Sequence, residues 1–552
     1  MIRRSLAAVA AAAAALCLAP AAHADETSSG DKLRILYSNR FTFTDDGLPL
    51  VTVEIVGGRD TVTLAAKGGL VVRPDGGGGS AVETRDGATW TIRAEDTQPA
   101  EIEEWVVVAR LAPDDATGAQ AERKRWKERG YAPRTFEVGA VFGVDGEVID
   151  TREMLIAVDG GAAPGGAARA AKIARKYGVA ATVHRDLVRR PTGTIIAESG
   201  GTVVRNPSVL WFQPRDATET VAVDDVPVGA GGSQAVTRSE TRRYWGSVYV
   251  TLDADGHLVA VNAVPEDKLL DGLVPAEIFP DAPAEALQAQ AIAARTELLE
   301  KIGHRNTTDP FLLCSTQQCQ VYAGAGHEDP RTTRAVEQTR GIVILRDGGG
   351  LADIRYSASC GGHGEDNDRI WGGDADPSLR GHTDATGKTR FASVDADNLD
   401  AFLDDDADHY WCGRTKKAKG RFRWSVTVSA KDLDALVAKQ YPEVGRVRAL
   451  TPTERGTSGR IGKLEIRGSK GTVVAEGDLH IRRLLGGLKS TLFAIRVDGP
   501  ADAPKSFTFD GAGFGHGVGM CQVGAIGMAE AGKSHDDILD HYYRGTHLHR
   551  LY

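Results

Sequence analysis

The sequence predicts an α+β fold that is rich in β-strands. Residues 25–100 consist mainly of short β-branched runs, residues 101–198 alternate strand and helix patterns, and residues 241–552 surround one long Ala-rich helix with further strands. With 552 residues the chain is too long for one ordinary hydrophobic core, so we expect several domains. Residues 1–24 are assigned to a leader, and residues 199–240 to strands and a linker.

The first 24 residues have the pattern of a secretory signal peptide. Arg3 and Arg4 precede an Ala/Leu run, and Ala-His-Ala at 22–24 precedes Asp25. A basic start, a short apolar run and a small-residue end are typical of a cleaved leader, and Pro20 closes the run too early for a membrane anchor. We therefore expect the mature chain to begin at Asp25 and to be secreted or periplasmic.

Composition and charge argue against a membrane-spanning protein and against a nucleic-acid-binding protein. The chain is 41% hydrophobic and 26% charged, and no apolar run after residue 24 is long enough to cross a bilayer. It has 66 Lys and Arg against 75 Asp and Glu; without the two arginines of the leader the count is 64 against 75, a formal charge of −11. Such an acidic protein is poorly suited to nucleic acid, and we expect no nucleic-acid partner.

The first two predicted domains differ in their patterns. Residues 25–100 contain strand runs such as LVTVEIV and ATWTIRAED, separated by Gly and Asp turns, and form a small β unit. Residues 101–198 have the order βαββαβ, with helices in AQAERKRWKERGY and GGAARAAKIARKYG and the last strand in TGTIIAE. This order loosely resembles the SPOR family, small domains that bind peptidoglycan glycan strands without stem peptides. An unrelated ferredoxin-like module has the same order, and both alternatives stay open.

A linker and a long helix open the third domain. The segment VPVGAGGSQAVTRSE at 226–240 is Gly/Ser-rich, as linkers are, and the strand pair RRYWGSVYVTLDADGHLVAVNAVP follows it. Residues 283–302 are the clearest helix, with Pro283 in the first turn and Gly303 as the stop. Its many alanines and a single apolar stripe predict a buried scaffold helix; the stripe consists of Leu287, Ala291, Ala294 and Leu298.

Glycine occupies every second position from 511 to 519, in GAGFGHGVG. In an extended strand, residues two apart share a face, so the stretch predicts a strand with one face of bare backbone. Such a face allows a ligand to lie close to the main chain. The alternative is a strand packed tightly on another strand, with no ligand.

The segment GMAEAGKS at 527–534 matches the phosphate-binding pattern G-x-x-x-x-G-K-[ST]. A phosphate-binding loop joins a strand to a helix, whereas MAEA consists of helix formers. Ser534 and Asp537 instead predict the N-terminal cap of a new helix. We therefore expect no nucleotide ligand.

Several motifs, in a fixed order, resemble the SpoIID/LytB family. The segment GFGHGVGMCQVGAIGMAEAGKSHDDILDHYYRGT is similar to the family's closing motif. The segment LVPAEIFPDAPAEALQAQAIAARTELL is similar to its opening motif, in which V-P-x-E precedes E-A-L-x-A-Q-A-x-A-A-R-T. Between them CSTQQCQVYAG, TRAVEQTRGIVIL, YSASCGGH and LLGGLKSTLFAI also follow the family order. The resemblance covers residues 241–552.

The resemblance implies a lytic transglycosylase of cell-wall peptidoglycan whose single essential acid is the Glu of V-P-x-E, here Glu277. Apolar neighbours flank this carboxylate, and an apolar site raises the pKa of a carboxyl group and keeps it protonated near neutral pH. Glu277 would protonate the glycosidic oxygen and then, as the ionised form, accept the proton of the 6-hydroxyl of N-acetylmuramic acid as that hydroxyl attacks C1. The product is a 1,6-anhydro end, and no second carboxylate is needed.

Further residues follow the family pattern around this acid. We expect them to bind or orient the glycan: Gln290, Arg295, Thr296, Tyr356, Gly515, His516, Gly517 and Gln522. For Arg295 a structural ion pair is an equally good alternative. The glycine face would form a flat floor of the glycan cleft, and the polar segment 361–387 is expected to be a mobile surface loop at its rim.

Five cysteines follow the leader: Cys314, Cys319, Cys360, Cys412 and Cys521. Disulfides persist outside the cytosol, so a disulfide among the first four is favoured. The resemblance adds an alternative, because some family members hold zinc in the segment that corresponds to CSTQQC; here Cys360 and His363 would complete the site. Cys521 stands where the family usually has Ser and is expected to be a small packed residue. We assign no metal ligand and no cofactor.

Two functions from different classes fit these motifs. In the first, the chain is an enzyme that cleaves peptidoglycan glycan strands. In the second, which the resemblance to LytB-type proteins implies, it is a non-catalytic, glycan-binding enhancer of an N-acetylmuramoyl-L-alanine amidase. Glycan strands are the expected ligand in both, an amidase is the expected partner in the second, and both imply association with the cell wall.

Overall fold

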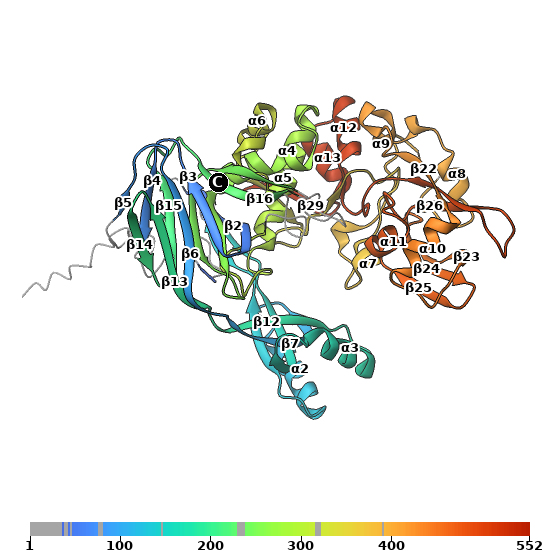
Figure 1. The fold of residues 1–552 in the computed structure, drawn as a ribbon. Coiled ribbons are helices and arrows are strands. Elements are labelled where there is room, and N and C mark those ends of the chain that lie inside the picture. The colour runs from blue at the N-terminus through green and yellow to red at the C-terminus, as the bar shows by residue number, and fades with distance from the viewer. Residues whose placement is uncertain are drawn as a thin grey trace, which may run out of the picture.

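The computed structural model describes residues 36–37, 42–44, 47–74, 81–144, 147–228, 238–314, 322–388 and 391–552. Figure 1 shows a β-rich body on the left, an α/β module below it and a mixed lobe on the right. The fold is mixed α+β and rich in strands, as expected. In the described ranges no helix is both long and apolar enough to span a bilayer. The expected leader lies outside these ranges.

Two antiparallel sheets form the β body, which comprises residues 42–98 and 192–265. One has the order β1 (Thr42–Phe43), β2 (Pro49–Arg59), β19 (Leu258–Pro265), β18 (Ser247–Leu252), β15 (Leu210–Pro214), β4 (Leu70–Pro74) and β5 (Val82–Glu83). The other has the order β14 (Thr202–Asn206), β13 (Thr192–Ser199), β6 (Thr89–Gln98), β3 (Thr61–Ala65), β16 (Val221–Val228) and β17 (Arg238–Tyr244). Apolar side chains of both sheets share one core. The division expected at residue 241 therefore runs through these sheets.

The α/β module, residues 101–189, is inserted between β6 and β13. Its elements are β7 (Glu101–Leu111), α2 (Ala116–Glu128), β8 (Arg134–Val138), β9 (Val141–Val144), β10 (Glu147–Asp150), β11 (Glu153–Ala162), α3 (Gly166–Tyr177) and β12 (Thr182–Arg189). The sheet order β12-β7-β11-β8 is that of a split βαβ fold. Its last strand is β12; the run TGTIIAE instead lies in β13 and pairs with β6 and β14 of the β body.

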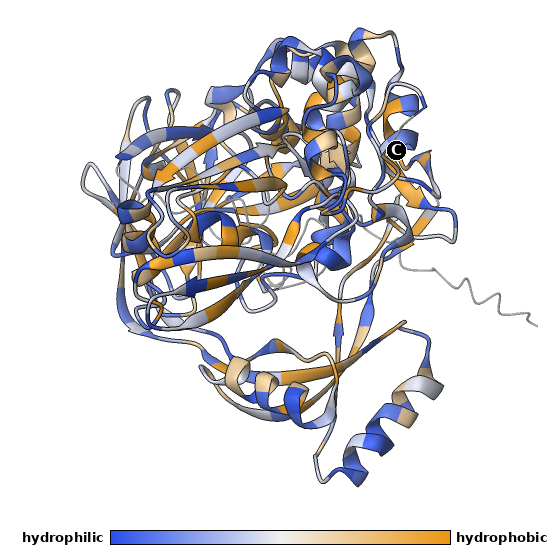
Figure 2. Cartoon of the chain, turned by 90° about the vertical axis from the view of Figure 1, so that its right-hand side faces the viewer, coloured by the Kyte–Doolittle hydropathy of each residue, from blue (hydrophilic) through white to orange (hydrophobic). Residues whose placement is uncertain are grey.

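The module has a small core of its own and also packs against the body. Figure 2 shows it projecting from the rest of the chain. Trp126 and Ile173 pack in its core, whereas Phe142 and Ile149, from the β9–β10 hairpin, pack into the core of the β body. The backbone N–H of Gly139 also donates to the carbonyl of Gly303, 2.8 Å away, just beyond the long helix. The hairpin therefore fixes the module beside the C-terminal lobe.

The C-terminal lobe, residues 266–552, is built around the predicted Ala-rich helix. The expected helix at 283–302 is confirmed as α5 (Ala284–Lys301), which is buried along most of its length. Its small side chains let five elements pack closely around it: α4 (Glu266–Glu277), α6 (Pro330–Gln338), β20 (Ile342–Arg346), α12 (Gln522–Glu530) and α13 (His535–Tyr542). Strand β29 (Thr546–Arg550) pairs with β20, and β21 (Tyr356–Ser357) runs parallel to β28 (Met520–Cys521).

The outer part of the lobe contains two three-stranded sheets. One consists of β22 (Arg423–Ser429), β27 (Ser506–Ala512) and β26 (Phe493–Asp498), and the other of β23 (Val447–Arg455), β24 (Ile461–Gly468) and β25 (Thr472–Glu476). Helices α10 (Ala430–Ala438) and α11 (Asp478–Leu484) share their core. Short helices connect the parts: η1 (Ala325–His327), α7 (Asn367–Trp371), η2 (Pro377–Leu379), α8 (Leu399–Leu403), η3 (Ala407–His409), α9 (Trp411–Arg414) and η4 (Lys416–Ala418).

The segment GMAEAGKS belongs to one helix at its start and caps another at its end, as predicted. Its first residues belong to α12, which continues to Glu530. Ser534 caps α13: its side chain accepts from the N–H of Asp537, and the Asp537 carboxylate accepts from the N–H of Ser534. The predicted N-terminal cap is confirmed.

Candidate functional site

Glu277 is the last residue of α4, at the edge of the lobe. The helix contains Pro275 in its last turn, and Ile278 leaves it in an extended conformation with its N–H bonded to the Val274 carbonyl. Val274 and Ile278 are buried in the core beneath, so the end of the helix is anchored while the Glu277 side chain is half-buried. The local sequence thus places one carboxylate at a fixed helix end.

The Glu277 side chain lines an open cleft of about 1270 Å³. Tyr356, from β21, and His516, from the glycine-rich stretch, line the same cleft. Arg110 and Thr182 of the module contribute to the wall as well. The cleft therefore lies between the lobe and the module.

Gln522 holds the backbone of Glu277, and Gln290 in turn holds Gln522. Gln522, the first residue of α12, donates from Nε2 to the Glu277 carbonyl at 3.0 Å and to Gln290 Oε1 at 3.1 Å. Gln290 lies on α5 and is fully buried. Gln522 therefore contacts the main chain of the acid, and Gln290 contacts Gln522.

Arg295 and Thr296 lie in the core instead of the cleft, so the prediction that they bind the glycan is wrong. Arg295 is fully buried and pairs with the equally buried Glu266 at 2.7 Å; it also donates to the Thr339 carbonyl. Thr296 donates to the Ile292 carbonyl and accepts from the N–H of Ile344. A buried arginine needs such a complete set of partners, so the ion-pair alternative for Arg295 holds.

His516 presents one ring nitrogen to the protein. The N–H of Val518 donates to Nδ1 at 3.0 Å, so the neutral ring carries its proton on Nε2. Burial lowers the pKa of His516 to about 4, which keeps the ring neutral at physiological pH. Its ring centroid lies 4.9 Å from that of Trp371, at an interplanar angle of 59°. The pair forms one aromatic side of the cleft.

Trp371 is a cleft residue that the sequence interpretation missed. It ends α7, within the segment 361–387, and is 54% exposed although it is a large apolar side chain. An exposed tryptophan in a cleft is a good surface for the apolar face of a sugar ring. The same segment is not simply a surface loop: its Glu365 is buried and accepts from Thr457 and Ser458.

The cleft is rich in charge of both signs. Besides Glu277 it is lined by the acids Glu297, Asp353 and Asp478 and by five cations: Arg110, Lys301, Arg305, Arg355 and Arg482. Three ion pairs connect these groups: Glu297 pairs with Lys301, Asp353 with Arg355 at 2.6 Å, and Asp478 with Arg482 at 3.2 Å.

Burial and neighbouring charges shift the pKa values of two cleft residues, Asp353 and Tyr356. Burial raises the pKa of Asp353 to about 6, although Arg355 acts in the opposite direction. Burial also raises the pKa of Tyr356 well above its usual range, and the negative charges of Glu297 and Glu277 add to that shift. Tyr356 is therefore a neutral hydrogen-bonding phenol beside the acid.

The glycine-rich stretch is not the extended strand that the sequence predicted. Strand β27 ends at Ala512, and the next glycines have left-handed backbone angles that other residues rarely adopt. Their φ values are +79° for Gly513, +101° for Gly515, +79° for Gly517 and +68° for Gly519. A left-handed residue at every second position makes a compact loop instead of a flat floor.

Close packing explains why this glycine loop, residues 513–519, has no side chains at those positions. A Cβ on Gly517 would overlap the guanidinium of Arg460, which is buried and bonded to the carbonyls of Cys360 and His363. A Cβ on Gly519 would overlap the Arg355 carbonyl. Gly515 and Gly517, which we expected to contact glycan, pack against other parts of the protein. This arrangement is close to the alternative of tight packing without a ligand.

The cysteines divide into two groups. Cys314 is disulfide-bonded, in line with the preference for a disulfide, and the rest of CSTQQC lies outside the described residues. Cys360, Cys412 and Cys521 are free thiols in the interior. His363 is bonded through its ring to the carbonyls of Gly364 and Ala392, so the zinc set with His363 does not form.

Two family models match parts of this chain. Residues 254–345 match the family model of a stage II sporulation protein, and residues 365–519 match a domain of unknown function, DUF8618. The chain is 29% identical over 306 residues to the amidase enhancer of Bacillus subtilis (strain 168), a match that spans 50% of this chain but only 40% of that protein.

Two further relatives carry the name stage II sporulation protein D. The protein from Bacillus amyloliquefaciens is 28% identical over 303 residues, which cover 52% of this chain and 75% of the relative. The protein from B. subtilis (strain 168) is 27% identical over 303 residues, covering 52% and 76%.

The fold and the site together define a β-rich α+β protein with an acid at a helix end in an open, charged cleft. The family model and the named relatives identify it further: residues 254–345 match the stage II sporulation protein (SpoIID) family, and the resemblance to the SpoIID/LytB family that the motifs indicated is confirmed.

Proposed function

We propose that this protein acts on the bacterial cell wall and cleaves peptidoglycan glycan strands by lytic transglycosylation. The position of Glu277 carries the proposal: it ends a buried helix in an open cleft, and Gln522 holds its carbonyl at 3.0 Å. A fixed acid that faces an open cleft is the minimum that this reaction requires.

The proposed reaction uses Glu277 twice. The protonated carboxyl group donates its proton to the glycosidic oxygen as the C1–O bond breaks and the sugar gains oxocarbenium character. The 6-hydroxyl of the same N-acetylmuramic acid then bonds to C1, and the Glu277 carboxylate takes the hydroxyl proton. The acid is restored, no water is consumed, and one new chain end is a 1,6-anhydro sugar.

The other cleft acids favour this single-carboxylate mechanism over ordinary hydrolysis. Hydrolysis of a glycoside commonly uses a second carboxylate, either to activate water or to attack C1. Glu297, Asp353 and Asp478 are each engaged with a cation. Such pairing engages the carboxylate oxygens and fixes their orientation, so these three acids are better suited to shaping the cleft.

The cleft cations favour glycan without stem peptides. When the stem peptide is removed, the lactyl group of each N-acetylmuramic acid ends in a free carboxylate, and the strand becomes a polyanion. Five cations against four acids line the cleft of a chain whose formal charge is −9. This local excess of positive charge would attract such a strand. His516 and Trp371 would then bind the sugar rings.

One observation favours a second function. The relative from B. subtilis that is 29% identical is named an amidase enhancer. In that alternative the cleft binds glycan without cleaving it, and the protein brings an N-acetylmuramoyl-L-alanine amidase to its substrate. The module, if it is SPOR-like, would supply a further glycan contact.

Turnover by the purified chain distinguishes these functions. Residues 25–552 would be incubated with peptide-free glycan strands, without any amidase, and soluble fragments measured by chromatography. We expect release by the native chain and a loss of about 10²- to 10⁴-fold in Glu277→Gln. Glu337→Gln is the matched control, because Glu337 is exposed on α6, and should retain activity. Binding without release by the native chain would favour the enhancer, and full activity of Glu277→Gln would exclude Glu277 as the acid.

A further inference from the structure

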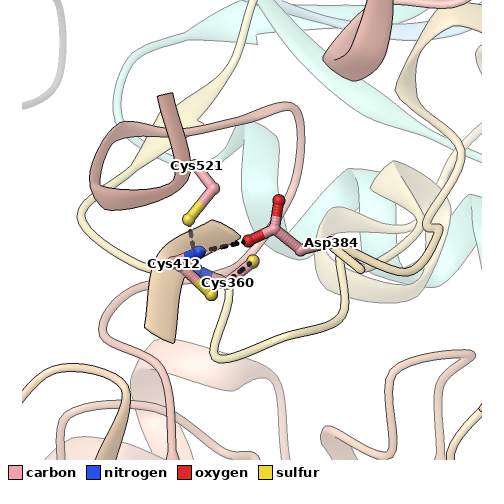
Figure 3. A group of neighbouring side chains, drawn as sticks. All are labelled: Cys360, Asp384, Cys412 and Cys521. Atoms are coloured by element: carbon pink, nitrogen blue, oxygen red, sulfur yellow. Dashed lines mark hydrogen bonds between the residues drawn. The ribbon is translucent and has the colours of Figure 1, made fainter. Parts of the chain in front are cut away.

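Three cysteines and one aspartate meet in the interior of the lobe, outside the cleft. Cys360, Cys412, Cys521 and Asp384 are all buried, and their ligand atoms lie within 4.8 Å of one another. Figure 3 shows the four side chains gathered from separate segments of the chain. Cys360 follows β21, Cys412 lies on α9, Cys521 ends β28, and Asp384 comes from the segment between η2 and α8.

The spacing of the sulfur atoms suits a shared ion better than a disulfide. Cys360 Sγ and Cys412 Sγ are 3.7 Å apart. Two thiolates bound to one tetrahedral zinc ion, each at about 2.3 Å, lie about 3.8 Å from each other. A disulfide requires about 2.05 Å. Thiolates with one carboxylate, in a compact set of four, are a zinc-type ligand set.

The surroundings already contain donors of the kind that support bound thiolates and carboxylates. Cys521 Sγ accepts from the N–H of Cys360 at 3.1 Å and from the N–H of Gly524 at 3.3 Å, at the start of α12. Such N–H donors and the positive end of the helix dipole favour thiolate charge. Asp384 accepts from the Tyr542 hydroxyl at 2.7 Å and from the N–H of Cys412 at 2.9 Å, which fixes the direction of its carboxylate.

A buried carboxylate beside three thiols needs a compensating charge. Asp384 is 1% exposed, and in the described part of the chain the nearest ionisable nitrogen is His541 Nε2, at 3.4 Å from Asp384 Oδ1. A small cavity of about 10 Å³ adjoins the cluster on the side of Cys360 and Asp384, where Arg380 and His382 also line it. The charge of the cluster therefore allows a cation.

We propose that Cys360, Cys412, Cys521 and Asp384 bind one tetrahedral zinc ion. All four positions are supplied by the protein, so the site is closed and structural. The ion joins four separate segments of the chain, and it holds the start of α12. Because Gln522 follows Cys521 directly and bonds to the Glu277 carbonyl, the ion also supports the position of the acid. This zinc site stands whether or not Glu277 cleaves glycan.

Metal content and X-ray absorption of the full mature chain test this proposal. Protein prepared in zinc-supplemented medium and passed through a chelating resin should retain one zinc ion per chain. Its absorption spectrum should fit three sulfur ligands at about 2.3 Å and one oxygen at about 2.0 Å. Replacement by cobalt should give the thiolate charge-transfer and visible bands of a tetrahedral site.

Variants separate this site from the segment that contains Cys314. Cys521→Ser and Asp384→Asn should lose zinc, whereas Cys314→Ser combined with Cys319→Ser should keep it. If Cys521→Ser fails to fold, the native protein still decides through its sulfur count. A metal-free native chain would overturn the proposal, as would a disulfide between Cys360 and Cys412 found by peptide mass spectrometry, or zinc that is lost only in the Cys314/Cys319 variant.

Discussion

The end of α4 and the glycine loop both line the same cleft but contribute differently. The first exposes its last residue, Glu277, while the helix behind it is buried. The second is mostly buried: it presents His516 and packs its glycines against Arg460 and the backbone near β21. The difference indicates that a family motif can be mainly architectural, and that its chemistry sits where an element ends at the cleft.

The largest expected effect is on stability, from Gly517→Ala. A methyl group there meets the guanidinium of Arg460 at a backbone φ of +79°, and Arg460 cannot move without losing its buried hydrogen bonds. We expect a loss of about 3 kcal/mol or more in the free energy of unfolding. Denaturant unfolding measures it, with Gly326→Ala, where the added methyl group meets no atom, as the control. An unchanged midpoint would show that the glycine loop is not architectural.

The next effect is a pH dependence of stability through His516. Its pKa is about 4 in the folded chain but 6.5 when unperturbed, so the unfolded state binds more protons between these values. Stability is therefore full above pH 6.5 and falls, by at most about 3 kcal/mol, as the pH approaches 4. His516→Gln should reduce this slope, and exposed His327→Gln should not. Equal slopes in all three proteins would mean that His516 is not buried in its neutral form.

A smaller effect, on turnover, is expected at Gln522. This residue positions the backbone of Glu277 and takes no part in the proposed proton transfers. Gln522→Ala removes the hydrogen bonds to the Glu277 carbonyl and to Gln290. If turnover is established, kcat should fall about 10- to 100-fold with little change in KM, since the acid is displaced but the cleft remains. Gln288→Ala, on the exposed side of α5, is the control. A change in KM alone would instead assign Gln522 to glycan binding.

The smallest effect is expected at Trp371. Trp371→Ala removes an exposed ring from the cleft wall and should weaken glycan binding by about 1 kcal/mol, or roughly fivefold, without changing the melting temperature. Val203→Ala, at an exposed site on β14, should change neither quantity. Undiminished glycan affinity in Trp371→Ala would remove this residue from the site.

The sequence predicted those features that depend on local pattern. The alanine-rich period gave α5 to within a residue at each end, and Ser534 with Asp537 gave the cap of α13. The motif also located Glu277 in a cleft. In these cases the residues that decide the outcome are neighbours along the chain.

Features that depend on distant partners could not be predicted in the same way. Arg295 follows the motif like Gln290 does, but its role is decided by Glu266, which is buried against it from another helix. Alternation predicted a strand for the glycine stretch, whereas contact with Arg460 and β21 requires a loop. The grouping of Cys360, Cys412 and Cys521 across the lobe appears only when the chain is folded.

The most direct test of the central claim is mass spectrometry of the chain ends released from peptide-free glycan in water labelled with oxygen-18. We predict fragments that end in 1,6-anhydro-N-acetylmuramic acid, one water lighter than hydrolysis products and free of the label, from the native chain and not from Glu277→Gln. Labelled reducing ends would contradict the single-carboxylate mechanism, because they would show that water and not the 6-hydroxyl attacks C1.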